Sequence, residues 1–500
     1  MNHFTPLDYA IFAIYLGATV AVGVRFSKGQ NSLREYFLAG RNVNRYIVAI
    51  TVIAALFSGI SYLAGPAEVF QNGIGFSLII FSFFVATPLT TLVVLPKLYS
   101  NKYLTAYHYF EERFSQPLRL LASGLFILRV SLWLAAATYA PALALQKVTG
   151  LPLVFTILCT GLLSTIYTMK GGMRAVIWTD VMQLAVLFSG QVLIVLVAVG
   201  KIPDGFQGVL NAALEDHRLD INLSLDPRER VTLWSVIIGG AFLNLVQMAT
   251  DQVSVQRYLT AGSLREAQRS LWIKLWLFLP VFGIFYGTGL VLHAFYRQHG
   301  NPLTEGLIER ADQILPHFVV TQLPAGLPGI LLAAIFAASM STISAGVNSL
   351  TSATISDFHL ALRPEEEMDE LDLVRRSKRW TIVYGLLVTG LAFAISAMRS
   401  NLVESVNSII GLVGGPMLGL LCLGILVPRA NTRGALTGTL VGFVALLVLF
   451  FYRRAPAPGA PPTTLVSFLW FTMIGTLITV AVGWLTSGRS QPQTDNRTKI

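Results

Sequence analysis

Residues 47–66 read IVAITVIAALFSGISYLAGP, an apolar run of the length that crosses a lipid bilayer. Small and polar residues that weaken a helix interrupt it, namely Ser58, Gly59, Ser61, Gly65 and Pro66. The run near residues 232–250 is broken in a similar way by Asn244, Gln247, Thr250 and Asp251. Irregular backbone at membrane depth is tolerated only where it is buried in protein or lines a cavity, so both runs predict broken helices. The alternative is that Gly, Ser and Pro serve close helix packing, as Gly415 and Gly419 would.

The overall composition places the chain in a membrane. Of its 500 residues 54% are hydrophobic and only 12% are charged, and the mean hydropathy is +0.63. This length accommodates about a dozen spans and short connectors, which leaves no room for a separate catalytic domain. The net charge of +10 is spread over short loops, which argues against nucleic acid as a partner. Only two cysteines occur, and neither a zinc motif nor a phosphate-binding loop is present, so we expect no cofactor.

Apolar runs of spanning length predict about thirteen transmembrane helices. They lie near residues 6–25, 47–66, 76–96, 119–146, 151–169, 175–200, 232–250, 272–296, 326–355, 379–398, 405–427, 432–451 and 464–486. The two interrupted runs are the second and the seventh. A unit of five helices re-enters the membrane in the opposite direction, and transporters with inverted repeats build a midplane site from two such broken helices. The spacing therefore predicts a five-plus-five core.

Loop charges orient the predicted helices. Five basic residues follow the first run, between Arg25 and Arg45, whereas only Glu68 follows the second. By the positive-inside rule the amino terminus faces outward and the carboxyl terminus lies in the cytoplasm, with Arg257, Arg265 and Arg269 in an inner loop. Two pairs fit this orientation less well: Arg228 with Arg230, and Arg453 with Arg454.

A cluster of oxygen ligands is predicted in the ninth run. Ala338, Ser341 and Thr342 lie at i, i+3 and i+4 and so share one helix face. Two hydroxyls and a carbonyl suit a hard cation such as sodium, and a broken second span could supply further carbonyls. The alternative is that both hydroxyls bond back to carbonyls of their own helix.

Two charged residues fall inside predicted spans, where ionisable groups are costly and usually functional. Asp180 lies in the sixth run, either on the solute pathway or at a helix amino terminus that the helix dipole stabilises. Arg129 lies about ten residues beyond Arg119, hence roughly 15 Å deeper, and is the only guanidinium predicted at such depth. It is a candidate counter-charge for an anionic solute, although it could also snorkel.

Six stretches of the chain resemble the sodium:solute symporter family, and within it the branch of monocarboxylate, multivitamin and iodide symporters. They are YFLAGRNVN at 36–44, YAPALALQKVTG at 139–150, GGMRAVIWTDVMQ at 171–183, DQVSVQRYL at 251–259, FAASMSTISAGVNSL at 336–350 and GGPMLGLLCLGILVPRAN at 414–431. The resemblance implies an all-α membrane protein with one leading helix, a five-plus-five inverted-repeat core and two trailing helices. The implied units are 1–30, 31–201, an outer loop 202–231, 232–428, 429–486 and a disordered cytoplasmic tail 487–500.

The resemblance also implies ligands. Its principal sodium site maps to the carbonyls of Ala54, Phe57 and Ala338 with the hydroxyls of Ser341 and Thr342. A second sodium site, found in some members, maps to Asp180, Ser341 and Ser344, but the next position is Ala345 and offers no hydroxyl. The substrate would bind at Ser58, Ser61 and Tyr62 on one side and at Asn244 and Gln247 on the other. Arg129 occupies a position that is usually uncharged in the monocarboxylate branch, which favours a carboxylated sugar or a vitamin.

The expected function is therefore sodium-coupled import of a small anionic solute by a monomer in the plasma membrane. A sodium-independent facilitator, a proton-coupled carrier, or a carrier of a neutral sugar or amino acid are the alternatives. A membrane enzyme is not expected, because no nucleophile, base or metal cluster shares one depth.

Overall fold

The computed structural model describes residues 5–26, 29–99, 103–150, 152–363, 369–396, 402–454 and 463–488. These residues are almost entirely helical; the exception is a ribbon of two-residue strands, β1 (Arg453–Arg454) and β2 (Thr463–Thr464). The predicted tail 487–500 lies outside the described residues from position 489 onward.

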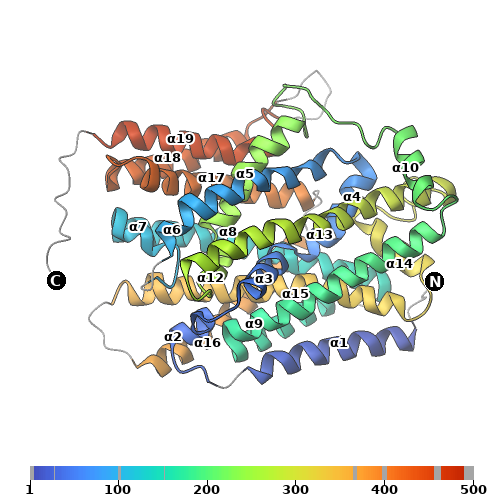
Figure 1. Cartoon of the computed structure of the whole chain (residues 1–500), viewed down its shortest axis with the longest axis horizontal. Helices are drawn as coiled ribbons and strands as arrows, with labels where there is room; N and C mark the ends of the chain where they lie inside the picture. The colour runs from blue at the N-terminus through green and yellow to red at the C-terminus, as the bar shows by residue number, and fades with distance from the viewer. Residues whose placement is uncertain are drawn as a thin grey trace.

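The first half of the chain runs up to the outer loop. Its elements are α1 (Pro6–Arg25), α2 (Leu33–Leu38), η1 (Ala39–Arg41), α3 (Arg45–Leu56), α4 (Gly59–Asn72), η2 (Gly75–Ser82), α5 (Phe83–Leu89), η3 (Thr90–Val94), α6 (Leu95–Leu98), α7 (His108–Arg113), α8 (Gln116–Thr149), α9 (Leu153–Gly200) and α10 (Phe206–Glu215). In Figure 1, α10 lies at one end of the bundle and α7 at the other.

The second half repeats this pattern of long and broken helices. Its elements are η4 (Ser235–Gly239), α11 (Gly240–Leu245), η5 (Val246–Thr250), α12 (Gln252–Tyr258), α13 (Leu264–His299), η6 (Ala311–Gln313), α14 (Ile314–Gln322), α15 (Leu327–Ala353), η7 (Thr354–Leu360), α16 (Glu370–Ser396), α17 (Leu402–Leu426), α18 (Thr432–Phe451), η8 (Phe468–Trp470) and α19 (Phe471–Thr486). α1 runs along one edge of the bundle, and α18 and α19 run along the opposite edge (Figure 1).

Each of the predicted spans coincides with helical structure. Among the described residues nine helices are long and apolar enough to cross a membrane, and two bent pairs bring the number to eleven. α9 contains two predicted spans, because Gly172 leaves the helical conformation at φ 54° and ψ −155°. Leu163 and Val186, on either side of Gly172, pack in the same apolar cluster, so the chain folds back there. α17 supplies the remaining span, with Ile410–Leu426 as its shorter apolar core.

Both predicted breaks are present. α3 and α4 are bent by 66°, and the helical segment Ser235–Thr250 is bent by 57° against α12. Each second half begins with a polar N-cap in extended conformation, Ser58 for α4 and Asp251 for α12. The side-chain oxygens of these residues accept hydrogen bonds from Ser61 N and Val253 N, which replace the helical bonds lost at the break.

α15 is the central helix of the bundle. Of its most apolar window 94% is buried within the protein, and it packs against α8 and α9. Its small residues permit this: a Cβ on Gly346 would lie 2.5 Å from Leu134 Cδ1. The predicted oxygen ligands are therefore carried by a helix that the rest of the fold surrounds.

Two of the loop charges used for orientation have other roles. Arg230, in the loop predicted to lie outside, donates two hydrogen bonds to Glu68, at 2.6 and 2.8 Å, so its charge is balanced locally. Arg257 does not lie in a loop as predicted: it is fully buried in α12. Its depth was misjudged because the polar sequence around it resembles a connector.

Candidate functional site

The break in the second span lies beside the hydroxyls of α15. Ser341 Oγ lies 2.9 Å from the carbonyl oxygen of Ala54 and 3.0 Å from that of Ala338. Thr342 Oγ1 lies 3.1 Å from the Ala338 carbonyl and 3.3 Å from that of Ala55. Each hydroxyl contacts a carbonyl of its own helix, as the back-bonding alternative predicts, and also a carbonyl of the neighbouring broken helix, as the ion site would require. Oxygens from two helices thus converge at one buried point.

Phe57 contributes differently from the other predicted ligands. Its backbone leaves the helix at φ −91° and ψ 88°, at the point where α3 ends. Its ring packs against Phe285, with the centroids 4.2 Å apart, and borders the adjoining cavity. The residue therefore links the oxygen cluster to the cavity, and its carbonyl remains a predicted ligand.

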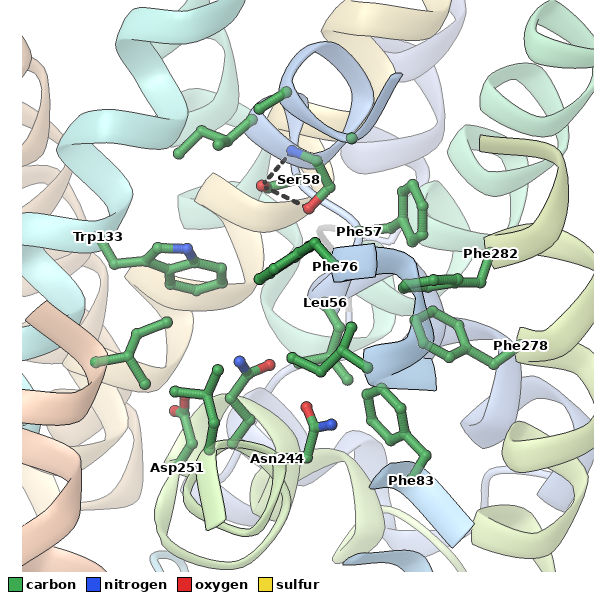
Figure 2. Close-up of a pocket in the computed structure, with 18 of the residues that line it drawn as sticks. Leu56, Phe57, Ser58, Phe76, Phe83, Trp133, Asn244, Asp251, Phe278 and Phe282 are labelled. Atoms are coloured by element: carbon green, nitrogen blue, oxygen red, sulfur yellow. Dashed lines mark hydrogen bonds between the residues drawn. The ribbon is translucent and has the colours of Figure 1, made fainter. Parts of the chain in front are cut away.

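A cavity with about 1000 Å³ of empty volume, part of it open to solvent, lies between the two broken spans. Its lining combines both half-helix starts with side chains of η2, α5, α8, α13 and α17: Leu56, Phe57, Ser58, Ile60, Ser61, Ala64, Gly65, Phe76, Ile79, Phe83, Arg129, Trp133, Leu243, Asn244, Gln247, Asp251, Phe278, Phe282, Tyr286 and Ile410. In Figure 2 Phe57, Phe278 and Phe282 stand on one side and Trp133 on the other, with Asn244 and Asp251 below. An aromatic enclosure with few polar groups is the usual character of a small-molecule site.

Five of the six predicted substrate residues line this cavity: Ser58, Ser61, Arg129, Asn244 and Gln247. Asn244 donates a 2.6 Å hydrogen bond to Ser82 Oγ, which fixes its amide. The exception is Tyr62, which is fully buried and packs edge-on against Phe285 at 5.2 Å. Ser61, Ala64 and Gly65 share the cavity face of α4, and Tyr62 lies about 100° around the helix from Ser61. Tyr62 therefore does not line the cavity in this structure, and its role as a substrate ligand stays a prediction.

Arg129 lies at the cavity wall and is paired there with a carboxylate. Its Nη2 lies 2.7 Å from Asp251 Oδ2, and the two side chains are 1% and 4% exposed. The contact lacks hydrogen-bond alignment, and Nε has no hydrogen-bond partner among the described residues. Asp251 meanwhile uses Oδ1 to cap α12. The guanidinium thus keeps donor capacity that a solute could use.

Asp180 is paired as well, with an arginine that the sequence-based prediction had assigned to a loop. Its Oδ2 accepts a 3.0 Å hydrogen bond from Arg257 Nη2 and another from the Thr51 hydroxyl. Arg257 also donates from Nε to Thr51 and from Nη1 to Val253 O. Ser344 donates to Ser341 O at 3.0 Å, and no described contact joins it to Asp180. The second ion site stays a prediction, with no direct contact between Asp180 and Ser344 among the described residues.

The sequence-based prediction missed two features of this region. One is the aromatic lining, which comes from apolar runs in which no single phenylalanine stands out. The other is Lys274, a fully buried ammonium on α13. A lysine two residues inside the run 272–296 was a signal for it, but a charge so near the end of a span is normally expected to snorkel.

The fold and the site are those of a secondary transporter, because two broken helices border one cavity. Residues 36–442 match the sodium:solute symporter family. The mouse sodium-coupled monocarboxylate transporter 1 is 34% identical over 457 residues, which cover 89% of this chain and 73% of the relative. A putative sodium-dependent multivitamin transporter of Drosophila melanogaster is 32% identical over 526 residues, covering 96% and 86%.

Among solved structures, the substrate-bound, outward-open state of a Na⁺-coupled sialic acid symporter superimposes with a TM-score of 0.88 at 30% identity, covering 98% of this chain and 99% of the other. A nucleobase-cation symporter shares the fold at a TM-score of 0.57 and 14% identity. This chain belongs to the sodium:solute symporter family, and the resemblance recognised in its sequence is confirmed. It is a multi-pass membrane transporter that couples a small solute to sodium.

Proposed function

We propose that the chain imports a small organic anion, with one sodium ion held between the second span and α15. The ion's ligands are the carbonyls of Ala54, Phe57 and Ala338 and the hydroxyls of Ser341 and Thr342. The convergence of Ser341 Oγ and Ala54 O at 2.9 Å supports this set. Oxygen-only coordination suits a hard cation.

Sodium binding is coupled to the conformational change because the ion has ligands on both α3 and α15. Sodium between α3 and α15 stabilises the outward-open form, and the solute then closes the outer gate. When the two helices separate on inward rocking, the ion loses ligands from one side, so sodium and solute are released to the cytoplasm. The coupling free energy is the difference in affinity between the two states.

The anionic character of the solute is carried by one observation, the buried Arg129 Nε without a hydrogen-bond partner at the cavity wall. A guanidinium with free donors binds a carboxylate bidentately. The first turn of α4 borders the same cavity, and the positive end of a helix favours an anion. A monocarboxylate, a vitamin with a carboxylate or a carboxylated sugar would satisfy these groups, and the aromatic lining would enclose the remainder.

Asp180 acts in this scheme as a partner of Arg257 and not as an ion ligand, which supports a coupling of one sodium per solute. The outward amino terminus, the cytoplasmic carboxyl terminus, a lipid-embedded monomer and a plasma-membrane location complete the proposal. Transport without catalysis is consistent with the family to which the chain belongs.

Uptake into proteoliposomes tests the proposal directly. Labelled lactate, nicotinate, biotin, pantothenate and sialic acid are offered with an inward sodium gradient, with a proton gradient, and with neither. We expect accumulation of at least one carboxylate only with the sodium gradient. Equal uptake in all three conditions would identify a facilitator, and uptake driven by protons alone would identify a proton-coupled carrier.

The ion site is tested by Thr342→Ala. Removing one of five ligands should raise the sodium concentration for half-maximal uptake about tenfold, since a lost charge-assisted contact is worth roughly 1.5 kcal/mol. Ser339→Ala is the matched control, because Ser339 is equally buried on α15 and its hydroxyl has no partner among the described residues. Sodium dependence that is unchanged in Thr342→Ala would contradict the ligand assignment.

A further inference from the structure

Lys274 is a fully buried ammonium at the inner end of the cavity. It stands on α13 one turn from Phe278, toward the helix end that begins at Leu264. Its Nζ lies 4.0 Å from the ring centroid of Phe83 and 5.1 Å from that of Phe278, and both rings line the cavity. The charge is therefore separated from the cavity by a single layer of aromatic rings, whose faces favour a cation.

No carboxylate contacts this ammonium within the described part of the chain. Its remaining polar neighbour is the sulfur of Met248 at 3.9 Å, a weak acceptor. The other deeply buried cations differ: Arg257 is paired with Asp180, Arg129 with Asp251, and Arg119 with Asp357. A buried ammonium without a partner is costly and favours the neutral amine, so a carboxylate that came close to Lys274 would supply the counter-charge it lacks.

The charges around the cavity do not cancel. Arg129 and Asp251 neutralise each other across 2.7 Å, so this pair gives the cavity donors but no net charge. Lys274 is the remaining basic group beside the cavity, and in its protonated form it adds a positive charge that this pair does not cancel. A unit charge about 10 Å away at an effective dielectric constant near 20 changes a binding constant roughly tenfold, which is enough to discriminate an anion from its neutral analogue.

Polar groups continue inward from Lys274 between the third span and α13. Thr87 Oγ1 also lies 3.9 Å from the Met248 sulfur, so it shares a neighbour with Lys274. One turn further along the third span, Thr91 O accepts a 3.0 Å hydrogen bond from Gln268 of α13. The hydroxyls of Thr90 and Thr91 are buried and have no partner among the described residues. Unsatisfied polar groups in this arrangement are typical of a path that becomes hydrated in another state.

We propose that Lys274 is a specificity-determining residue, which selects anionic solutes and receives their carboxylate when the wall of Phe83 and Phe278 opens toward the cytoplasm. This inference rests on the proposed function, because it assumes that the solute is a carboxylate. Arg129 would orient the anion in the cavity. Lys274 would provide the charge that favours an anion over its neutral analogue, and it would bind the carboxylate during release.

The test compares acids with their amides as competitors of uptake in proteoliposomes. The pairs are lactate with lactamide, nicotinate with nicotinamide, and biotin with biotinamide, measured against whichever labelled carboxylate of the panel the wild-type protein accumulates. Lys274→Met and Lys274→Gln remove the charge, and Lys274→Arg keeps it. Lys201→Met is the control, since Lys201 is exposed and its ammonium donates hydrogen bonds to Gln322, away from the cavity lining. Binding of ²²Na⁺ in detergent reports whether each variant is folded.

We expect the preference for acid over amide to fall about tenfold in both neutral variants, to stay within threefold of wild type in Lys274→Arg, and to be unchanged in Lys201→Met. Sodium binding should persist throughout. An unchanged preference in the neutral variants, or an equal loss in Lys274→Arg, would overturn the inference. Loss of sodium binding in both neutral variants would assign Lys274 a structural role instead. A wild-type protein that accumulates no panel carboxylate would refute the proposed function, and the inference with it.

Discussion

Two buried arginine–aspartate pairs lie within the same bundle and differ in how completely their guanidinium groups are hydrogen-bonded, although Asp180 Oδ1 of the first pair also lacks a partner among the described residues. Arg257 and Asp180 are both 0% exposed, and the guanidinium donates from three nitrogens to Asp180, Thr51 and Val253. Arg129 and Asp251 are almost as buried, yet their contact lacks hydrogen-bond alignment and Nε of Arg129 is unbonded. Only the second pair lines the cavity.

The difference indicates that burial of charge does not by itself mark a binding site. A pair whose donors are all used holds helices together, since breaking it leaves an unpaired charge in a low-dielectric interior. Burying donors that form no hydrogen bond is unfavourable. A ligand that accepts hydrogen bonds from such donors at a cavity wall therefore regains that free energy. The first arrangement therefore predicts an effect on folding, and the second an effect on transport.

The largest effect is expected from Arg257→Met. Asp180 would keep its bond from Thr51 and lose the cation with which it is paired, which should lower the free energy of unfolding by about 3–5 kcal/mol. The melting temperature in detergent and the yield of folded protein in membranes measure this. Arg257→Met combined with Asp180→Leu should recover most of the loss, because replacing both partners by apolar groups leaves no buried charge.

The single and double variants together distinguish a structural role of the Arg257–Asp180 pair from a role in transport. If Arg257→Met melts like the wild-type protein but no longer takes up solute, the pair belongs to the transport machinery and the comparison fails. If the double variant is as unstable as the single one, the cost comes from lost packing of the arginine side chain and not from the unpaired carboxylate.

A smaller effect on folding and a larger one on transport are expected from Arg129→Gln. Asp251 still caps α12 through Oδ1, so the freed carboxylate retains a hydrogen bond and the favourable helix dipole. The KM for a transported carboxylate should rise about tenfold to a hundredfold, which corresponds to roughly 1.4–2.7 kcal/mol. Uptake kinetics across the carboxylate panel measure it, with ²²Na⁺ binding as the control for folding.

Unchanged uptake kinetics in Arg129→Gln would show that the guanidinium does not bind the solute. Arg129→Lys sharpens the result, because a lysine keeps the charge but loses the two-pronged geometry. We expect Arg129→Lys to be nearly as impaired as Arg129→Gln, and full activity with lysine would show that charge alone suffices at this position.

The fold was largely predictable because its signals are local. The breaks at Ser58 and Asp251 follow from small and polar residues inside apolar runs, and the face shared by Ala338, Ser341 and Thr342 follows from helical spacing alone. The meeting of that face with Ala54 required the family resemblance, since nothing in the spacing of residues 338–342 refers to residue 54.

The pairing of charges could not be predicted in the same way. Asp180 and Arg257 are joined by folding across 77 positions of sequence, and Arg257 sits in a polar segment, QVSVQRY, that hydropathy assigns to a loop. Arg129 was predicted as a counter-charge for the solute because its depth can be counted along a helix, whereas its partner Asp251 could not be read from the sequence. The same limit concealed the net charge that Lys274 leaves at the cavity.

The smallest effect is expected from Tyr62→Phe. This variant tests whether a buried polar atom without a partner marks a functional group even when it lies away from the cavity wall. Tyr62 shares one property with Arg129, a buried polar atom without a partner among the described residues, but it does not line the cavity. Removing an unsatisfied hydroxyl should leave stability unchanged or raise it by up to about 1 kcal/mol, and the KM for a carboxylate should change less than twofold. The melting temperature and uptake kinetics of this variant measure both. A tenfold rise in KM would mean that the ring turns into the cavity during transport, and that a missing partner marks a functional group even away from the cavity wall.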